Sequence, residues 1–395
     1  MRLSNLLVFL TLVTASCNEG LDGASPESDP NAVVLGKDAG VMIVESSSSL
    51  DGAAIESILP GTHRRVRTEG LLLGTDLQVR RLVDAKGGEH IFTVHSDQGL
   101  VIERDREGRA LEGRRYVVYD KARGPSSANP LDVALAADGS VWITRHGERS
   151  LLVFAPDGTV RATVDLASFA DDDGIPDMSA IAIVGDVAYV ALRRLEKGFG
   201  TRKNVSQIVA IDVNTRTPSL LLDLPVKDPG ARFLRRGNEL WISCIGGPLT
   251  KDAVGNPDPD RSAGLVRIDL GARKATVALS AEAAKGFVTA FDLVDDHTGY
   301  AIVGDFAPDN PTSLVRFDPT TGKLLDASPW ARTSGYKLWD VTALTTAAGE
   351  GLLLVADRTE ENPGLRVLST RDGARVGFIP TRLLPIQQIV LRSQP

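Results

Sequence analysis

The sequence has few cysteines, few aromatic residues and no excess of basic charge. Only two of its 395 residues are cysteines, Cys17 and Cys244, so no framework of disulfides holds the fold. Cys244 follows an apolar run and is predicted to be a half-buried core residue. The formal net charge of -7 argues against binding to nucleic acids or anionic membrane surfaces, since both require basic patches. Glycine and proline are frequent, at 38 and 21 residues, which is typical of short elements joined by turns.

Long hydrophobic runs are also lacking. No segment approaches the ~18 apolar residues that a transmembrane helix needs. A shorter run near the N-terminus, residues 6–13, follows Arg2 and precedes the small residues 14–16 and Cys17. This order resembles the lipobox of bacterial lipoproteins, in which the cysteine is lipidated and becomes the first mature residue. The alternative is an ordinary cleaved secretory signal with a chance cysteine, because Thr14 stands where Leu or Val is commoner.

The lipobox resemblance implies a division of the chain. Residues 1–16 are the expected lipoprotein signal peptide, and residues 17–30 are the expected lipidated Cys17 with a polar, flexible tether. The folded domain is expected to span residues 31–395. The protein is then predicted to be anchored to a membrane of the bacterial cell envelope, on the periplasmic side or the cell surface, without spanning it.

Beyond the tether, short β-rich runs recur along the whole chain. Their starts lie roughly 50 residues apart, a period typical of propeller blades with several strands each. The seven runs lie at residues 41–44, 91–94, 141–144, 188–191, 240–243, 300–303 and 352–355. Most are followed by a second strand, a turn and a further strand, whereas helical periodicity is nearly absent. The sequence therefore predicts an all-β fold, a seven-bladed β-propeller of four-stranded antiparallel blades.

The physics of burial supports this count. Alternation of apolar and other residues, as in residues 131–135, gives each sheet an apolar face that one blade cannot bury alone. Blades must therefore stack around an axis. The C-terminal run at residues 386–391 lies beyond the last full blade and is predicted to pair into the first blade and close the ring. Two separate domains of three to four blades are the alternative.

Two stretches carry a family resemblance. Asp-Gly-Ser-Val-Trp-Ile-Thr at residues 138–144, followed by residues 150–160, resembles NHL- and YVTN-type propeller repeats, and residues 185–191 with 208–215 are similar. Residues 129–132 and the loop after residue 170 also resemble features of secreted bacterial propeller lipoproteins, a family without an agreed activity. The resemblance implies the fold but not the function, because propellers host enzymes and binding proteins alike.

Propeller topology also predicts where a site lies. Loops from the second to the third strand of a blade, and loops between blades, emerge around one mouth of the channel, which we call the mouth face. Binding residues concentrate on such loops. The loops at residues 46–49, 196–203 and 246–263 belong to this face, and solvated loop ends without a ligand are the alternative. The candidate ligand-binding residues are His95, Arg145, His146, Arg193, Arg194, Asp305, Asp357 and Arg358.

An acidic loop on the same face is a candidate calcium site. Asp171, Asp173 and Asp177 could supply the oxygen ligands that Ca²⁺ prefers. The spacing differs from that of an EF-hand, and a simple turn is the alternative, since Asp-Gly and Pro favour turns. A second acidic loop at residues 256–260 is predicted to be a solvated insertion. A structural Ca²⁺ is the only cofactor predicted.

Other catalytic signatures are lacking. The sequence has no Cys-x-x-Cys, no Gly-x-Ser-x-Gly elbow, no Walker loop and no dinucleotide fingerprint. Its five histidines have no metal-ligand spacing, although His95 and His146 could face one another across neighbouring blades. A transition-metal centre is therefore not predicted.

Two functions remain open. The first is a monomeric cell-envelope binding or scaffold module that holds a protein, glycan or small ligand on the mouth face. The second is a propeller hydrolase or lyase of the lactonase type. Lactonase-type propellers hold a catalytic Ca²⁺ with residues from several blades, whereas the acidic residues here cluster in one loop. The sequence therefore favours binding over catalysis, with no nucleic-acid partner and membrane contact through the lipid anchor alone.

Overall fold

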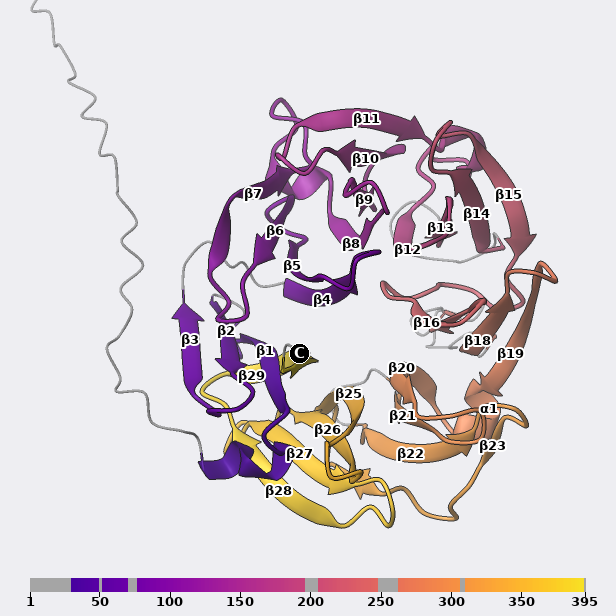
Figure 1. Ribbon diagram of the computed structural model, residues 1–395. Helices are drawn as coiled ribbons and strands as arrows, with labels where there is room; N and C mark the ends of the chain where they lie inside the picture. The colour runs from indigo at the N-terminus through magenta and orange to yellow at the C-terminus, as the bar shows by residue number, and fades with distance from the viewer. Residues whose placement is uncertain are drawn as a thin grey trace, which may run out of the picture.

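The computed structural model describes residues 30–49, 52–69, 77–195, 205–247, 262–305 and 310–393. These residues form seven antiparallel sheets that surround a central axis, as Figure 1 shows. The prediction of an all-β, seven-bladed propeller is confirmed. The predicted signal peptide, Cys17 and all of the tether except Pro30 lie outside the described residues. Among the described residues, no helix is long and apolar enough to cross a membrane.

Each blade runs outward from the axis, so its strands are named from the innermost to the outermost. Blade 1 contains β29 (Leu384–Arg392), β1 (Ala39–Ser46), β2 (Ala53–Ile58) and β3 (Arg65–Glu69), and blade 2 contains β4 (Leu77–Val83), β5 (Glu89–His95), β6 (Leu100–Arg104) and β7 (Ala110–Val117). Blade 3 contains β8 (Pro130–Leu135), β9 (Val141–Arg145), β10 (Ser150–Phe154) and β11 (Val160–Asp165). Blade 4 contains β12 (Met178–Val184), β13 (Val187–Leu192), β14 (Gln207–Asp212) and β15 (Pro218–Asp223).

The remaining blades follow the same plan. Blade 5 contains β16 (Leu234–Arg236), β17 (Glu239–Cys244), β18 (Gly264–Asp269) and β19 (Lys274–Ser280). Blade 6 contains β20 (Phe287–Leu293), β21 (Gly299–Gly304) and β22 (Ser313–Asp318), and its outer position is shared by β23 (Lys323–Leu324) and β24 (Ala331–Arg332), which both pair with β22. Blade 7 contains β25 (Leu338–Thr345), β26 (Gly351–Asp357), β27 (Gly364–Ser369) and β28 (Arg375–Pro380).

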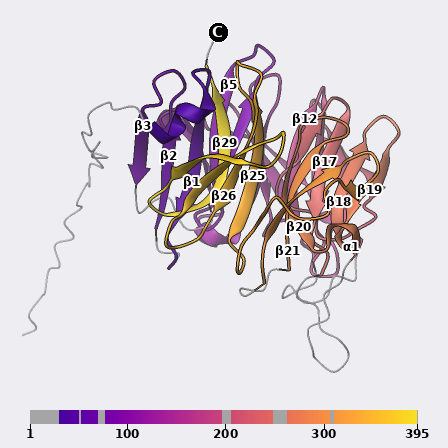
Figure 2. The ribbon, with the colours of Figure 1, turned by 90° about the horizontal axis from the view of Figure 1, so that it is seen from below.

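Short helices occupy some of the connections. The 3-10 helix η1 (Pro30–Leu35) packs its buried Ala32 and Leu35 into the apolar cluster between blades 7 and 1. The 3-10 helices η2 (Pro125–Ser127) and η3 (Ala167–Phe169) and the helix α1 (Ala281–Ala284) lie in loops between blades. The mouth face is therefore the end of the ring at which α1 lies, the lower end in Figure 2.

The ring is closed by its C-terminal strand. β29 pairs antiparallel with β1, with Val390 opposite Val41 and Gln388 opposite Ile43. Blade 1 thus combines strands from both ends of the folded domain, which confirms the prediction for residues 386–391. The alternative of two separate domains is wrong, because one continuous circle contains all seven sheets.

Apolar side chains between neighbouring blades form the core. Between blades 2 and 3, for example, Phe92, Tyr116 and Phe154 are fully buried, and the Tyr116 and Phe154 rings meet edge to face at 5.3 Å. Burial of such faces stabilises the ring by about 25 cal/mol per Å² of apolar surface. Cys244 is fully buried between blades 4 and 5, deeper than predicted, and burial raises the pKa of its thiol.

Candidate functional site

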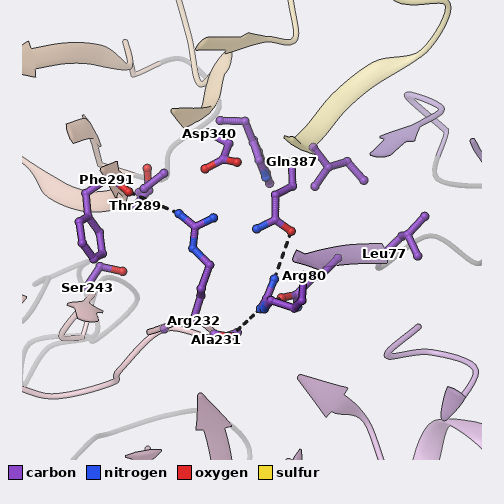
Figure 3. Close-up of a pocket in the computed structure, with 14 residues that line it drawn as sticks. Leu77, Arg80, Ala231, Arg232, Ser243, Thr289, Phe291, Asp340 and Gln387 are labelled. Atoms are coloured by element: carbon purple, nitrogen blue, oxygen red, sulfur yellow. Dashed lines mark hydrogen bonds between the residues drawn. The ribbon is translucent and has the colours of Figure 1, made fainter. Parts of the chain in front are cut away.

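The central channel holds a cavity of about 270 Å³, shown in Figure 3. Its lining comes from the first to middle residues of inner strands β4, β20, β25 and β29, from the segment before β16 and from the end of β17. Inner strands begin at the mouth face, so the cavity lies in that half of the channel. The lining residues are Leu77, Gln78, Arg80, Gly230, Ala231, Arg232, Ser243, Thr289, Ala290, Phe291, Trp339, Asp340, Ile386 and Gln387.

Irregular inner strands help to place polar side chains in the channel. The register of β8 shifts between Pro130 and Val133, and that of β25 shifts between Leu338 and Val341. Such bulges bend a strand and redirect side chains. Asp132 and Asp340 lie within these two bulges, and both are buried in the centre of the ring.

Several inner-strand side chains link one blade to the next. The innermost strand of a blade has one edge without a strand partner, and its amide groups need other acceptors. Three of these side chains are the carboxyl groups of Asp132, Asp292 and Asp340. Burial raises the pKa of each, although nearby arginines and backbone amides act to lower it. The acceptors are Asp132 for the Ile181 amide (2.9 Å), Asp292 for Ala343 (2.8 Å), Asp340 for Gln388 (3.3 Å) and Gln387 for Val79 (2.9 Å).

Arg80 braces the channel. It is buried, and its Nε lies 2.6 Å from the Asp132 carboxylate. Its Nη2 donates to Gln78 Oε1 at 2.7 Å and, across the channel, to the Ala231 carbonyl oxygen at 2.6 Å. A further bond reaches Gln387 Oε1 at 3.2 Å. With one more bond, from Nη1 to the Val79 carbonyl oxygen at 3.0 Å, the N–H groups are distributed over protein acceptors, which leaves this guanidinium little capacity for a ligand.

Arg232 lies on the opposite side of the cavity and is only half-buried. Among the residues that the structure describes, its guanidinium donates one long hydrogen bond, to the Phe291 carbonyl oxygen at 3.4 Å. Its positive charge counteracts the burial that raises the pKa of Asp292 and Asp340. Figure 3 shows its guanidinium inside the cavity, between Thr289 and Gln387.

An aromatic group forms another part of the wall. The half-buried Trp339 lines the cavity, and the Arg358 guanidinium lies 4.1 Å from the centre of its ring. The Tyr336 ring meets Trp339 edge to face at 5.2 Å. Burial raises the pKa of Tyr336 to about 12. Arg358 is thus the predicted ligand-binding residue that contacts a cavity-lining side chain, Trp339, among the residues that the structure describes.

Other predicted residues hold the mouth-face loops together. His95 is buried, with Nε2 2.9 Å from Thr93 Oγ1. Arg145 is also buried and donates to the carbonyl oxygens of Ser150 (2.7 Å) and Val118 (3.2 Å). Burial lowers the pKa of this guanidinium. Both side chains therefore serve as internal supports of blades 2 and 3.

His146, Asp177 and Arg193 lie in one chain of contacts across blades 3 to 5. His146 Nε2 is 3.7 Å from Asp177 Oδ1, and Asp177 Oδ2 accepts the Leu195 amide at 2.6 Å. Arg193 forms an ion pair with the buried Asp228. Burial, with the Arg193 charge, lowers the pKa of His146 to about 3. Burial, with the charges of the neighbouring acidic loop, raises the pKa of Asp177 to about 7.

A repeated backbone clip explains this arrangement. A loop residue directly before β8, one directly before β12 and one a few residues before β16 have a positive φ, which Asn and Asp tolerate better than most residues. The carbonyl oxygen of each accepts an amide of the adjoining loop. The three clips are Asn129 (φ 43°) with His146 at 3.1 Å, Asp177 (φ 52°) with Arg193 at 3.0 Å, and Asp228 (φ 60°) with Ile245 at 3.0 Å.

The remaining candidates also have structural contacts. Asp357 is buried and accepts from Arg366 at 2.6 Å and from the Thr359 amide at 3.0 Å. Arg194 donates to the Val205 carbonyl oxygen at 3.1 Å. Asp305 is half-buried at the end of the described segment that contains β21. The loop at residues 196–203 and the second acidic loop at 256–260 lie outside the described residues.

The acidic loop itself is built from turns. Asp171 Oδ1 accepts the Asp173 amide at 3.2 Å, and Asp173 Oδ1 accepts the Ile175 amide at 2.8 Å. Such Asx turns are the structural use that Asp has in loops. Within the described part of the chain, no group of three or more His, Cys, Asp or Glu side chains is arranged to hold a metal ion.

The cavity residues were not among the sequence candidates. A usable signal existed for the acidic residues of the inner strands, of which Asp340 lines the cavity, because Asp interrupts the apolar runs at 131–133 (Leu-Asp-Val), 291–293 (Phe-Asp-Leu) and 339–341 (Trp-Asp-Val). Arg232 lies in the irregular segment before the short strand β16, where a single sequence offers no comparable signal.

Solved structures share this fold. They include apo AztD from Citrobacter koseri (12% identity, TM-score 0.52, 90% of this chain and 98% of that one). They also include candidate 6-phosphogluconolactonases from Bacteroides fragilis (13% identity, TM-score 0.53, 92% of this chain and 100% of that one) and Bacteroides uniformis (14% identity, TM-score 0.52, 90% and 100%). At these identities the likeness shows the propeller fold alone. No protein-family model and no curated protein matches the sequence.

Proposed function

We propose that the protein is a binding module of the bacterial cell envelope that holds a small polar ligand in the channel cavity. One observation carries this proposal. The cavity of about 270 Å³ contains a half-buried arginine, Arg232, whose donors face the cavity. At the mouth face, by contrast, Arg145, Arg193 and Asp357 are bound to neighbouring protein groups. Concave sites with a few convergent polar groups are the usual ligand sites of proteins. The volume suits a ligand below drug size.

A fragment screen tests this binding site. Of the four tryptophans, Trp339 lines the cavity, so its indole N–H resonance reports on occupancy. Neutral, anionic and cationic fragments are titrated, and some are expected to shift this resonance but not those of the buried Trp142 and Trp241. Ser243→Leu should fill the cavity and abolish the shifts, whereas Ser219→Leu, at an exposed position of β15, should preserve them. No shift from any fragment, or shifts that survive in Ser243→Leu, would overturn the proposal.

The lipid anchor is part of the proposed function. The lipobox-like N-terminus supports it, as do residues 129–132 and the loop after residue 170, which resemble features of secreted bacterial propeller lipoproteins. Cys17→Ala is expected to move the protein from the membrane fraction to the soluble fraction. Cys244→Ala is the matched control, since this cysteine is buried in the core, and it should leave the protein on the membrane. Membrane association of Cys17→Ala would refute the anchor.

A hydrolase is the second candidate. The observation that favours it is Asp340, a buried carboxyl group in the cavity lining whose pKa is raised by burial, as in many general acids and bases. Hydrolysis of glucono-1,5-lactone by the purified protein tests this function. A rate above buffer that falls in Asp340→Asn would support a hydrolase, and a rate equal to buffer would exclude this lactone activity.

A further inference from the structure

The two arginines of the cavity differ in what they can offer a ligand. Arg80 donates to Asp132, Gln78, Gln387 and a carbonyl oxygen across the channel. Arg232 has one 3.4 Å bond among the described residues and is half-buried. A ligand in this cavity therefore meets Arg232 as its main cationic donor, with capacity for more than one hydrogen bond.

The charges around Arg232 decide which ligands suit the cavity. Asp340 lines the cavity, the half-buried Asp292 lies on the same inner strand as the lining residue Phe291, and both interact with the charge of Arg232. Asp132 is paired with Arg80. An anionic ligand would gain from Arg232 but would face two carboxyl groups in a poorly solvated space. A cationic ligand would instead face Arg232. Either charge would remain incompletely balanced, which is costly in such surroundings.

The other polar groups of the lining are neutral. The amide oxygens of Gln78 and Gln387 are occupied by Arg80, and Figure 3 shows the Gln387 amide nitrogen on the side of the cavity toward Arg232. Hydroxyl groups come from Ser243 and Thr289. Hydroxyl groups on a ligand can donate and accept, so they can use all of these groups together.

Apolar surface completes the site. Trp339 and Phe291 line the cavity beside the polar groups, together with aliphatic side chains of the inner strands. Aromatic rings supply a flat apolar contact surface. The C–H face of a ring-shaped polyol would fit such a wall, while its hydroxyl groups reach the polar residues.

We infer that the ligand is a neutral polyhydroxyl compound of about one sugar ring, with hydroxyl groups that accept from Arg232 and donate to Asp340. This inference rests on the proposed function, because it specifies the ligand class of the same cavity. The inference distinguishes this cavity from a site for phosphorylated or acidic sugars, whose carbon skeletons resemble those of the neutral compounds.

The test compares six-membered-ring polyols that differ in charge. D-Glucose and the carbocyclic myo-inositol are the neutral probes, D-glucuronate and glucose 6-phosphate the anionic ones, and D-glucosamine the cationic one. The Trp339 indole resonance is followed during each titration of the full-length protein. At least one neutral probe is expected to bind with saturation, and each charged probe about tenfold more weakly or worse.

Two variants and a control connect the binding to the named residues. Arg232→Met should weaken binding of the neutral probe about tenfold or more, because a bond to a charged donor is lost. Asp340→Asn keeps the size of the side chain and an oxygen for the Gln388 amide, and it should also weaken neutral binding. Arg235→Met changes an exposed arginine of β16 and should leave the affinity unchanged.

The outcomes separate this inference from the proposed function. If the anionic probes bind best, and bind more tightly to Asp340→Asn, the cavity is a ligand site but the ligand is an anion, and the inference is overturned. If no sugar or polyol binds while other fragments shift Trp339 in the fragment screen, the inference fails and the proposed function stands. If neither the probes nor the fragments shift Trp339, both are overturned.

Discussion

The rim of the mouth face and the wall of the channel cavity both carry charged side chains, but they use them differently. At the rim, Arg145 donates to carbonyl oxygens, Arg193 pairs with Asp228, and Asp357 pairs with Arg366. In the wall, Arg232 has one long bond among the described residues and faces the cavity. The rim charges thus hold loops, whereas a wall charge is available to a ligand.

The position of each region in the fold explains the difference. Loop ends contain backbone groups that lack a strand partner and are partly buried, so charged side chains are needed there to satisfy them. Inner strands satisfy most of their backbone through the sheet, and a charged side chain there costs desolvation energy. A charged side chain in the channel wall, such as Asp340 in β25 or Arg232 in the segment before β16, is therefore a stronger indication of a specific task than a charge at a loop end.

The largest expected effect comes from removing the brace of the wall. Arg80→Met leaves the carboxyl group of Asp132 buried without its partner, which typically costs about 3–5 kcal/mol. Arg232→Met should cost only about 1 kcal/mol, since this guanidinium is half-buried and makes one long bond among the described residues. Equilibrium unfolding in urea measures both values.

The double variant Arg80→Met with Asp132→Leu sharpens this comparison. Removing both charges should recover part of the lost stability, because no unpaired buried carboxyl group remains. Equal losses in Arg80→Met and Arg232→Met would show that both arginines are structural, and the distinction between brace and ligand donor would fail.

The fold was largely predictable from the sequence, but the site was not. The period of the runs at 141–144 and 188–191 identified the blades, because strand patterns repeat locally and each blade buries the same faces. The closing strand followed from the leftover run at 386–391. The cavity, by contrast, depends on which inner-strand side chains meet across the axis, as Arg80 and Ala231 do. Such contacts join residues about half a ring apart, and no local pattern encodes them.

Among the predictions for the rim, calcium binding has the largest expected effect on stability. If the loop with Asp171, Asp173 and Asp177 binds Ca²⁺, an ion present at 100 times its Kd stabilises the folded state by ~2.7 kcal/mol. The calcium prediction therefore expects a higher Tm in Ca²⁺ than in chelator, and Asp177→Asn should remove the difference. Identical melting curves in both buffers would leave the rim with turns and clips but no ion.

The titration of Asp177, also at the rim, is expected to have a smaller effect on stability. Because its pKa is about 7 in the folded protein and about 3.8 when unfolded, the folded state binds more protons between these values. The carboxyl group therefore lowers stability as the pH rises through this range. Asp177→Asn should be more stable than the wild type by on the order of 2 kcal/mol at pH 8, and the advantage should vanish near pH 4.

His146 affects the wild-type curve in the opposite sense. Its pKa is lowered to about 3, so the unfolded state binds more protons below about pH 6.5, and acid destabilises the fold. In the wild type, the changes of unfolding free energy with pH that Asp177 and His146 cause have opposite signs and nearly cancel. In Asp177→Asn the effect of His146 should remain, as a loss of stability below about pH 6.5. Asp165→Asn, at an exposed position of β11, is the control. A variant whose stability follows the wild-type curve at every pH would disprove the shifted titration of Asp177.

The smallest effect concerns the rim residue that touches the wall. Arg358 stacks on Trp339, and a cation–π contact of this kind contributes about 1 kcal/mol. Arg358→Leu should therefore lower the free energy of unfolding by about 1 kcal/mol and shift the Trp339 indole resonance. Arg358→Lys should shift it as well, since the planar stack is lost while the charge remains. Arg194→Leu changes a rim arginine bound to a loop carbonyl oxygen and should leave the resonance in place. If Arg194→Leu moves it equally, rim and wall are coupled generally, and the separation drawn between them does not hold.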